Sequence, residues 1–261
     1  MTSPSTTASH RFPPREHLVQ VYAHDPFLAE VVSEFLGAGL RQSDGALVIA
    51  TPAHIEAFTA QLAFAGIDVA GAIAEERLLV LDAVRTLAQF LTDGVPDRAA
   101  FLGIMAAGLD RVRASGAARI RCFGEMVDLL WARNLPATLA LEELWNEVLA
   151  DERLSLLCAY RLDPFERSTR GILHQVSWCH SHLLPEENPQ RFRTAVERAY
   201  EDVFGVAGDA TMLRGLISNA SSRGPVMTTD QAALLALHDV SDDLAEQVLE
   251  RGRHHYVRLD R

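Results

Sequence analysis

Short apolar runs alternate with longer stretches of helical periodicity in the first 160 residues. Continuous apolar runs predict strands buried on both faces at residues 17–23, 45–51, 77–83, 118–125 and 154–160. The segments between them predict helices at residues 25–39, 52–66, 98–116, 126–134 and 138–151. Because crossovers of helical length join the strands, we predict an α/β fold whose mostly parallel sheet carries helices on both faces.

The first predicted helix has recognisable ends. Asp25 is expected to cap it, with Pro26 at its first position, and Gly37 and Gly39 are expected to end it. The turn before it, Ala-His-Asp-Pro, contains no glycine. A strand-turn-helix junction of this kind often holds a phosphate on a glycine-rich loop, so this turn raises the question of another ligand.

The pattern changes after Pro164, where the strand-like runs stop. Helical periodicity predicts an all-α region with helices at residues 168–185, 189–205, 210–220, 230–239 and 241–252. The tail from roughly residue 166 is therefore predicted to be nearly all α. The polar, proline-bearing stretch at residues 1–16 predicts a disordered leader.

Charge and composition narrow the function classes. The formal net charge is −11 at pH 7, which argues against a general nucleic-acid-binding surface. The sequence contains no lysine, which excludes the lysine of a phosphate loop and every Schiff-base mechanism. No apolar run reaches the roughly 20 residues of a membrane span. Three cysteines without a CxxC pair fit a reducing compartment, and Cys122 and Cys158 are expected to be buried thiols. These features predict a cytoplasmic protein without a membrane partner.

Polar residues at the carboxyl ends of the predicted strands form the candidate site, because parallel sheets bind ligands there. They are Tyr22, His24 and Asp25 after the first strand, Thr51 and His54 after the second, Asp82 after the third, Glu125 after the fourth, and Tyr160 after the fifth. Most have a simpler structural explanation. Asp25, Thr51 and Asp82 suit helix caps. Tyr160 suits a half-buried aromatic residue with one hydrogen-bond partner, and His24 suits an exposed position.

Glu125 is the strongest candidate. It follows an apolar run, where a carboxylate is costly unless it meets a partner or a ligand. Structural ion pairs also perturb carboxylates, so a structural role is equally open. We predict a ligand-binding rim at the strand ends, formed by Tyr22, His24, Asp25, Thr51, His54, Glu125 and Tyr160.

The segment WCHSH, residues 178–182, is the metal candidate of the sequence. On a helix, Cys179 and His182 would share one face, and thiolate and imidazole suit zinc. A closed zinc site needs four ligands, and no second Cys or His pair stands at standard spacing. We therefore predict no metal site, keep Cys179 and His182 as weak candidates, and identify no cofactor.

Motifs of enzymes are missing from the sequence. It contains no GxSxG, GxGxxG or HExxH. Because no nucleophile constellation emerges either, we predict that the protein is not an enzyme.

Several strings together carry a family resemblance: HLVQVYAHDPFLAEVVSEFLGAGLRQSDGALVIATPAHIEAFTAQLAFAGIDV, then RCFGEMVDLLW, ALEELWNEVL, LLCAY and CHSHLLPEE. In this order they resemble the MEDS domain, the methanogen/methylotroph sensory domain of DcmR-type regulators and of bacterial and archaeal histidine kinases. The resemblance covers residues 17–185. It implies a division of the chain into the leader at residues 1–16, a sensory domain at residues 17–185 and a helical C-terminal extension at residues 186–261. It implies a fold related to the RecA/KaiC-like ATPases but without their phosphate loop, and it places Glu125 near the acidic position of that fold.

The resemblance implies a sensory module that responds to a small-molecule ligand or to a signalling protein, such as a histidine kinase or a regulator. Regulators of this kind usually carry a helix-turn-helix or a kinase, and neither is recognisable here. The output is therefore expected to pass through the C-terminal helices or through a partner, and a homodimer is left open.

Two other functions are weighed against the sensory module. One is an atypical nucleotide-binding enzyme that uses arginines in place of lysine, and the missing phosphate loop argues against it. The other is a transcriptional regulator that binds DNA through residues 228–258. The acidic start of the predicted helix at residue 241 argues against that function, because it would repel phosphates.

Overall fold

The computed structural model describes residues 16–151, 153–205 and 210–259, so most of the predicted leader lies outside the described residues. The chain divides into two compact units. The first, called the sheet unit, contains the described residues up to Leu18 and the segment His24–Tyr160. The second, called the C-terminal unit, contains Val19–Ala23 and the chain from Arg161 onward.

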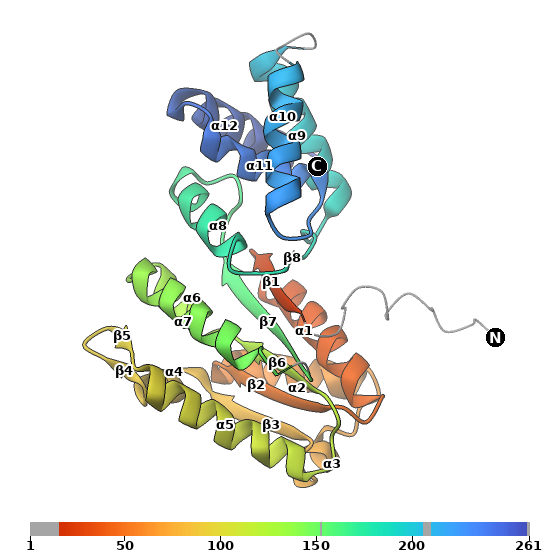
Figure 1. Ribbon diagram of the computed structural model, residues 1–261. Helices are drawn as coiled ribbons and strands as arrows, with labels where there is room; N and C mark the ends of the chain where they lie inside the picture. The colour runs from red at the N-terminus through yellow and green to blue at the C-terminus, as the bar shows by residue number, and fades with distance from the viewer. Residues whose placement is uncertain (1–15, 152, 206–209, 260–261) are drawn as a thin grey trace, which may run out of the picture. The chain divides into compact units, whose positions relative to one another are not determined.

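A six-stranded sheet forms the framework of the fold (Figure 1). Its strands are β1 (His17–Tyr22), β2 (Gly45–Ala50), β3 (Leu78–Asp82), β6 (Ile120–Gly124), β7 (Leu154–Arg161) and β8 (His182–Leu183), in the order β3-β2-β6-β7-β1-β8. β2 pairs in parallel with β3 and with β6, and β6 pairs in parallel with β7. The register places Leu47 opposite Leu79 and Cys122, and Cys122 opposite Leu156. The predicted strands and the mostly parallel α/β fold are confirmed.

Helices cover both faces of the parallel strands (Figure 1). On one face α1 (Asp25–Leu40) packs against α2 (Pro52–Phe64), and on the other α5 (Arg98–Ala114) packs against α7 (Leu135–Val148). This division follows from right-handed crossovers, because the connections from β2 to β3 and from β3 to β6 run in opposite directions across the sheet. Strands between two helix layers bury both faces, and every residue of β2 is buried.

The start of α1 differs from the prediction. His24, not Asp25, occupies the N-cap position, and Asp25 is the first helical residue, followed by Pro26. The carbonyl of His24 accepts the first helical hydrogen bond from the amide of Leu28 at 3.3 Å. No side chain caps the start of α1 by a hydrogen bond, and the carboxylate of Asp25 contacts His54 instead.

The end of α1 differs as well, because the helix continues past Gly37 and Gly39 to Leu40. The side chain of Arg121 explains the second glycine. A Cβ at position 39 would lie 2.7 Å from that side chain, which donates from Nη1 to the carbonyl of Phe35 at 3.0 Å. Gly39 is thus required by close approach rather than by the end of a helix.

Shorter elements complete the sheet unit: α3 (Val69–Ala74), α4 (Ala83–Ala88), the hairpin of β4 (Leu91–Thr92) and β5 (Val95–Pro96), and α6 (Met126–Trp131). The hairpin turns at Asp93 and Gly94, whose φ angles of 51° and 78° suit a type I′ turn. Asp82 caps α4 as predicted, since its Oδ1 accepts from the amide of Arg85 at 2.9 Å.

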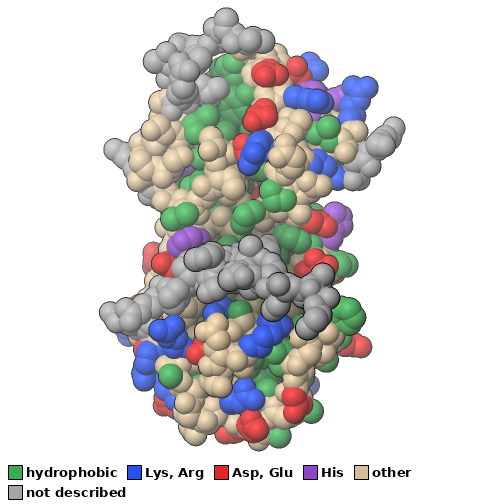
Figure 2. Space-filling model, turned by 90° about the vertical axis from the view of Figure 1, so that its right-hand side faces the viewer, with side chains coloured by type: hydrophobic (Ala, Val, Ile, Leu, Met, Phe, Trp, Pro, Cys, Tyr) green, Lys and Arg blue, Asp and Glu red, His purple; other side chains and the backbone are tan. Residues whose placement is uncertain are grey.

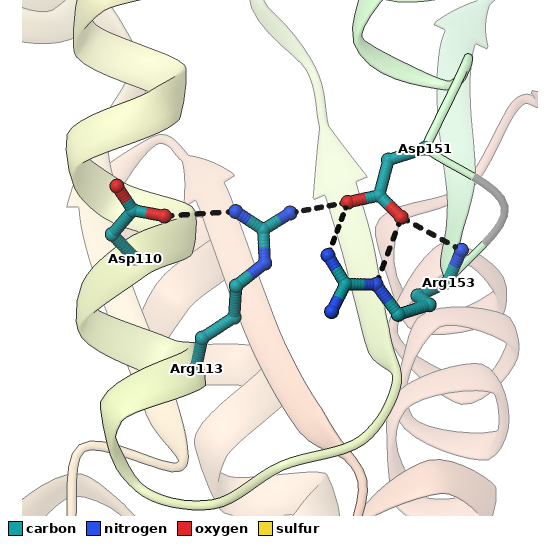
Figure 3. A network of polar contacts seen from close by, with 4 residues as sticks. All are labelled: Asp110, Arg113, Asp151 and Arg153. Atoms are coloured by element: carbon teal, nitrogen blue, oxygen red, sulfur yellow. Dashed lines mark hydrogen bonds and ion pairs between the residues drawn. The ribbon is translucent and has the colours of Figure 1, made fainter.

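An ion-pair network joins the end of α5 to the start of β7 (Figure 3). Arg113 donates to Asp110 at 2.8 Å and to Asp151 at 2.7 Å, and the side chain of Arg153 donates to both oxygens of Asp151. The hydrogen bonds and charge of Arg153, with the charge of Arg113, lower the pKa of Asp151 to about 2. Asp151 therefore stays ionised across the neutral and mildly acidic range.

The C-terminal unit is mainly helical, as predicted for the extension. Its helices are α8 (Arg170–Ser177), α9 (Pro189–Phe204), α10 (Ala210–Arg223), α11 (Thr229–Ala236) and α12 (Asp242–Arg258), with 3-10 turns at Arg167–Thr169 and Leu237–Asp239. α9 and α12 pack along each other, and their core includes Phe192, Ala199 and Val248. Thr228 and Gln231 close the start of α11 with a capping box.

The predicted helix at residues 168–185 is wrong in its second half. α8 ends at Ser177, and the chain then becomes extended and forms β8. The amide of Val226 donates to the carbonyl of Ser181 at 2.8 Å, and the amide of Leu183 donates to the carbonyl of Val226 at 2.9 Å. Pairing with a segment far along the chain thus replaces the helical hydrogen bonds, and local periodicity carries no information about such a partner.

Among the described residues, no helix combines the length and the apolar character that a membrane span requires. On the face drawn in Figure 2, arginine side chains lie among aspartate and glutamate side chains. On this face, charges of both signs are therefore interspersed, although the sequence as a whole has a net charge of −11.

Candidate functional site

The carboxyl ends of β2 and β6 mark the point where the winding of the sheet reverses. The two strands are neighbours, yet the chain leaves β2 toward β3 and leaves β6 toward β7, in the opposite direction. Ligands of open parallel sheets bind at such a switch point, because the two connections diverge there. The residues that directly follow these strands are Thr51 and Glu125.

Glu125 is buried at this junction, with 2% of its surface exposed. Its amide donates to the carbonyl of Ile49 in β2 at 3.1 Å, which fixes its backbone beside the neighbouring strand. One carboxylate oxygen accepts from the amide of Thr51, and the other makes a short contact with Nδ1 of His54. A single buried carboxylate therefore ties the end of β6 to the start of α2 through charge-assisted hydrogen bonds.

His54 lies in the first turn of α2, and both its ring and its charge have partners. The ring stacks on Phe58 with 5.4 Å between centroids, and Phe58 meets Phe123 edge-on at 5.1 Å. The hydrogen bond that His54 donates to Glu125 raises the pKa of His54. Burial opposes this shift, and the charges of Glu125 and Asp128 support it. The imidazolium form therefore persists to higher pH than in an exposed histidine.

Asp25 completes a row of three ionisable side chains, which we call the rim triad: Asp25, His54 and Glu125. Its Oδ1 lies 3.4 Å from Nε2 of His54. The exposed fraction of the side chain rises from 3% at Glu125 through 13% at His54 to 51% at Asp25. The rim triad therefore leads from a buried carboxylate to solvent.

The arrangement determines what the rim triad can do chemically. With His54 as imidazolium, the three side chains carry one net negative charge. Both oxygens of Glu125 are engaged by the protein itself, so a ligand would meet Asp25 and the outer edge of His54 first. Asp25 can accept a hydrogen bond or pair with a cation, and His54 can take up or release a proton.

The structure brings together the predicted site residues Asp25, Thr51, His54 and Glu125, and it places the others differently. Tyr160 is fully buried and donates to Oε1 of Glu142 at 2.5 Å. His24 is exposed at the N-cap position of α1. Tyr22 is buried in the C-terminal unit, where the guanidinium of Arg161 lies 5.4 Å from the centre of its ring. Thr51 contributes its backbone amide rather than its hydroxyl.

The weak metal candidates do not share a helical face, because α8 ends at Ser177. Cys179 donates to the carbonyl of Gln175 at 3.6 Å, and Nδ1 of His182 contacts the hydroxyl of Ser181 at 3.0 Å. The helical spacing on which the zinc hypothesis for this segment depended is therefore not present.

Sequence reasoning missed a second buried carboxylate. Glu142 on α7 is fully buried and lies close to His17 and Cys158. The helical pattern contained the signal, because Glu142 shares the buried face of α7 with Leu141 and Trp145. An ionisable residue at a core position of an amphipathic helix needs a partner, and that requirement would have identified it.

Comparisons with known proteins identify a family and proteins of similar structure. A family model described as MEDS, the MEthanogen/methylotroph, DcmR Sensory domain, matches residues 16–181. Among solved structures, a KaiC-like protein from the hyperthermophilic archaeon Pyrococcus horikoshii OT3 is similar, with 15% sequence identity and a TM-score of 0.45 over 67% of this chain and 74% of that chain. That likeness is too low to carry an argument about ligands or activity. No curated protein matches.

Proposed function

Since the chain belongs to the MEDS family of sensory domains, we propose that it is a non-enzymatic sensory module whose rim triad binds a small ligand. The response passes through the C-terminal unit to a signalling protein, such as a histidine kinase or a regulator. A cytoplasmic location is part of the proposal, because Cys122, Cys158 and Cys179 are not joined in disulfides.

The convergence of the rim triad at the switch point is the observation that carries this proposal. Its three side chains come from three separate segments and meet between the diverging connections of β2 and β6. A histidine with a raised pKa at such a strand-end junction is typical of functional sites. A structural ion pair alone would need only two partners and no graded path to solvent.

The charge at the start of α1 indicates the class of ligand. A helix N-terminus attracts anions through its free amides, but here the first helical residue is Asp25. Its half-exposed carboxylate repels a phosphate from that position. The favoured ligand is therefore a neutral or cationic molecule with an N–H or O–H group that donates to Asp25.

The chain provides a covalent route from the rim triad to the C-terminal unit. Val19–Ala23 belong to the C-terminal unit and lead into Asp25 through one residue. The amides of Leu184 and Leu162 donate to carbonyls of this segment at 2.9 and 3.2 Å. A ligand that displaces Asp25 therefore pulls on a segment that the C-terminal unit holds by backbone hydrogen bonds.

Native mass spectrometry of the freshly purified full chain tests the proposal. The wild-type protein is expected to retain a non-covalent small molecule that Asp25→Asn and His54→Gln lose. Glu56→Gln, an exposed carboxylate on the same helix as His54, is the matched control and should keep the molecule. A wild-type protein without any bound molecule, or equal retention by all variants, contradicts the proposal.

Two further assays test the two alternative functions. ATP turnover with magnesium that disappears in Glu125→Gln would indicate a nucleotide-binding enzyme instead. Salt-sensitive DNA binding would indicate a transcriptional regulator that uses α11 and α12. We expect neither result, since the start of α1 repels phosphate and the first turn of α12 carries Asp242 and Asp243.

A further inference from the structure

Three side chains with metal-ligating atoms meet inside the sheet unit, and the proposed function uses none of them. His17 opens β1, Glu142 lies on α7, and Cys158 lies in β7. Their exposed fractions are 5%, 0% and 0%. We call these three residues the buried triangle.

The ligating atoms of the buried triangle are almost equally spaced. Nε2 of His17 lies 3.3 Å from Oε2 of Glu142 and 3.4 Å from Sγ of Cys158. Sγ of Cys158 lies 3.6 Å from Oε2 of Glu142. Tetrahedral zinc at its usual bond lengths holds nitrogen, oxygen and sulfur ligands about 3.3–3.6 Å apart. The three atoms therefore match three corners of a zinc tetrahedron.

A cation between the three ligating atoms would contact all of them at once. Nδ1 of His17 lies 2.9 Å from Oδ1 of Asn146, and a ring proton on Nδ1 leaves the lone pair of Nε2 for a metal ion. Nε2 lies 3.3 Å from Oε2 of Glu142, and Sγ of Cys158 lies near both atoms. The imidazole, the carboxylate and the thiolate can therefore share one ion.

Two outer contacts orient the buried triangle as the second shell of a metal site does. A ligating histidine usually donates its other N–H to a carbonyl or carboxylate, and Asn146 accepts in this way from His17. The hydroxyl of Tyr160 donates to Oε1 of Glu142 at 2.5 Å, which leaves Oε2 for the centre. Ligand and outer contact are thus both present for the imidazole and for the carboxylate.

We propose that the buried triangle binds one divalent transition-metal ion, and that zinc fits its donor set best. Thiolate and imidazole ligands favour zinc over magnesium or calcium, which prefer oxygen ligands. The site is independent of the rim triad, so either can fail without the other.

Metal titration of the full-length protein, stripped beforehand with a chelator, tests the site. Wild type should bind one zinc ion per chain, and with Co²⁺ as probe it should show a thiolate charge-transfer band. Both signals should vanish in Cys158→Ala and persist in Cys122→Ala. Cys122 is the matched control, because it is a buried thiol in the neighbouring strand β6 and burial raises its pKa to about 12.

A second variant keeps the test decisive if Cys158→Ala does not fold. Asn146 is exposed on α7, so Asn146→Ala should fold while it removes the partner of the His17 ring. We expect its zinc affinity to fall about tenfold, with Glu143→Ala on the same helix unchanged. A wild-type protein that binds no zinc overturns the proposal, as does zinc binding by Cys158→Ala or Asn146→Ala with wild-type affinity.

Discussion

Two buried glutamates of the sheet unit each meet a histidine, but their surroundings differ. Glu125 follows a strand, shares its oxygens between a backbone amide and an imidazole, and leads to solvent through Asp25. Glu142 projects from a helix, contacts Tyr160 and the other two members of the buried triangle, and is fully enclosed. Both glutamates pair with an imidazole, so the two pairs differ mainly in their exposure to solvent.

This difference in solvent access predicts different roles for the two sites: the rim triad can exchange ligands and protons, whereas the buried triangle keeps what it binds. The outer carboxylate of the rim triad is half exposed, so small molecules and protons can exchange there within its ordinary motions. The buried triangle offers no such exposed member, and a charge enclosed in this way must be compensated permanently. We therefore expect substitutions in the buried triangle to act mainly on stability, and substitutions in the rim triad to act mainly on binding.

The largest effect is expected from Glu142→Ala. Removal of this carboxylate leaves the hydroxyl of Tyr160 and two members of the buried triangle with lost contacts in the core. We expect the free energy of unfolding of the metal-stripped protein to fall by about 3–5 kcal/mol in urea denaturation. Glu143→Ala, an exposed neighbour, should stay within about 0.5 kcal/mol of wild type. Similar values for both variants would remove the distinction.

Glu125→Ala should have the next largest effect. The amide of Thr51 and the ring of His54 lose their acceptor, and each poorly satisfied polar group costs on the order of 1 kcal/mol or more. We expect a loss of about 2–3 kcal/mol in the same urea experiment, with Glu56→Ala as the exposed control. A loss as large as that of Glu142→Ala would show that the two glutamates are equivalent in stability.

His54→Gln should cost less than Glu125→Ala and should depend on pH, because it removes one of the two partners of Glu125. The folded state raises the pKa of His54. Its stabilising effect is therefore fully present below the unfolded pKa of about 6.5 and is lost as the pH rises through the folded value. Urea curves should show a larger difference between wild type and His54→Gln near pH 5.5, below the unfolded pKa of about 6.5, than near pH 9. A difference that grows with pH would contradict the assignment.

The smallest effect is expected at Asp151, a carboxylate outside both sites. Its ion pairs are partly exposed, so Asp151→Asn should cost about 1 kcal/mol at neutral pH. Because the folded pKa is lowered from 3.8 to about 2, the stabilisation is present above 3.8 and is lost as the pH falls through about 2. Acid titration of both proteins by circular dichroism checks this window. A difference that persists unchanged below it would show that the contact is not ionic.

The sequence was informative where a residue's own neighbours decide its environment. Continuous apolar runs predicted the strands because strands between two helix layers bury both faces. Glu125 stood out because a charge directly after such a run needs a partner. The predicted rim grouped Glu125 with His54, but their direct contact could not be predicted. His54 lies 71 positions away, and the contact depends on the order that places β2 beside β6.

The two wrong predictions have a common physical origin, and the missed residue has a different one. The helix predicted at residues 168–185 gave way to extended pairing with Val226, and no local pattern encodes that partner. Glu142 lies within the helix predicted at residues 138–151, and its burial was missed although its neighbours on the same face are apolar. Tyr160 was expected at the rim, but its hydroxyl points to Glu142. Contacts between distant segments decided the structure of residues 178–185 and the position of Tyr160, whereas the local pattern of α7 already marked Glu142.

Hydrogen–deuterium exchange of the full-length protein, with and without its bound small molecule, tests the link between the rim triad and the C-terminal unit most directly. The amides of Leu162 and Leu184 report on this link, because they donate to carbonyls of Val19–Ala23. We predict that the molecule changes exchange at both amides in wild type and at neither in Asp25→Asn. Exchange at Leu162 and Leu184 that is the same with and without the molecule in wild type, while the amide of Thr51 responds, would contradict signalling by this route.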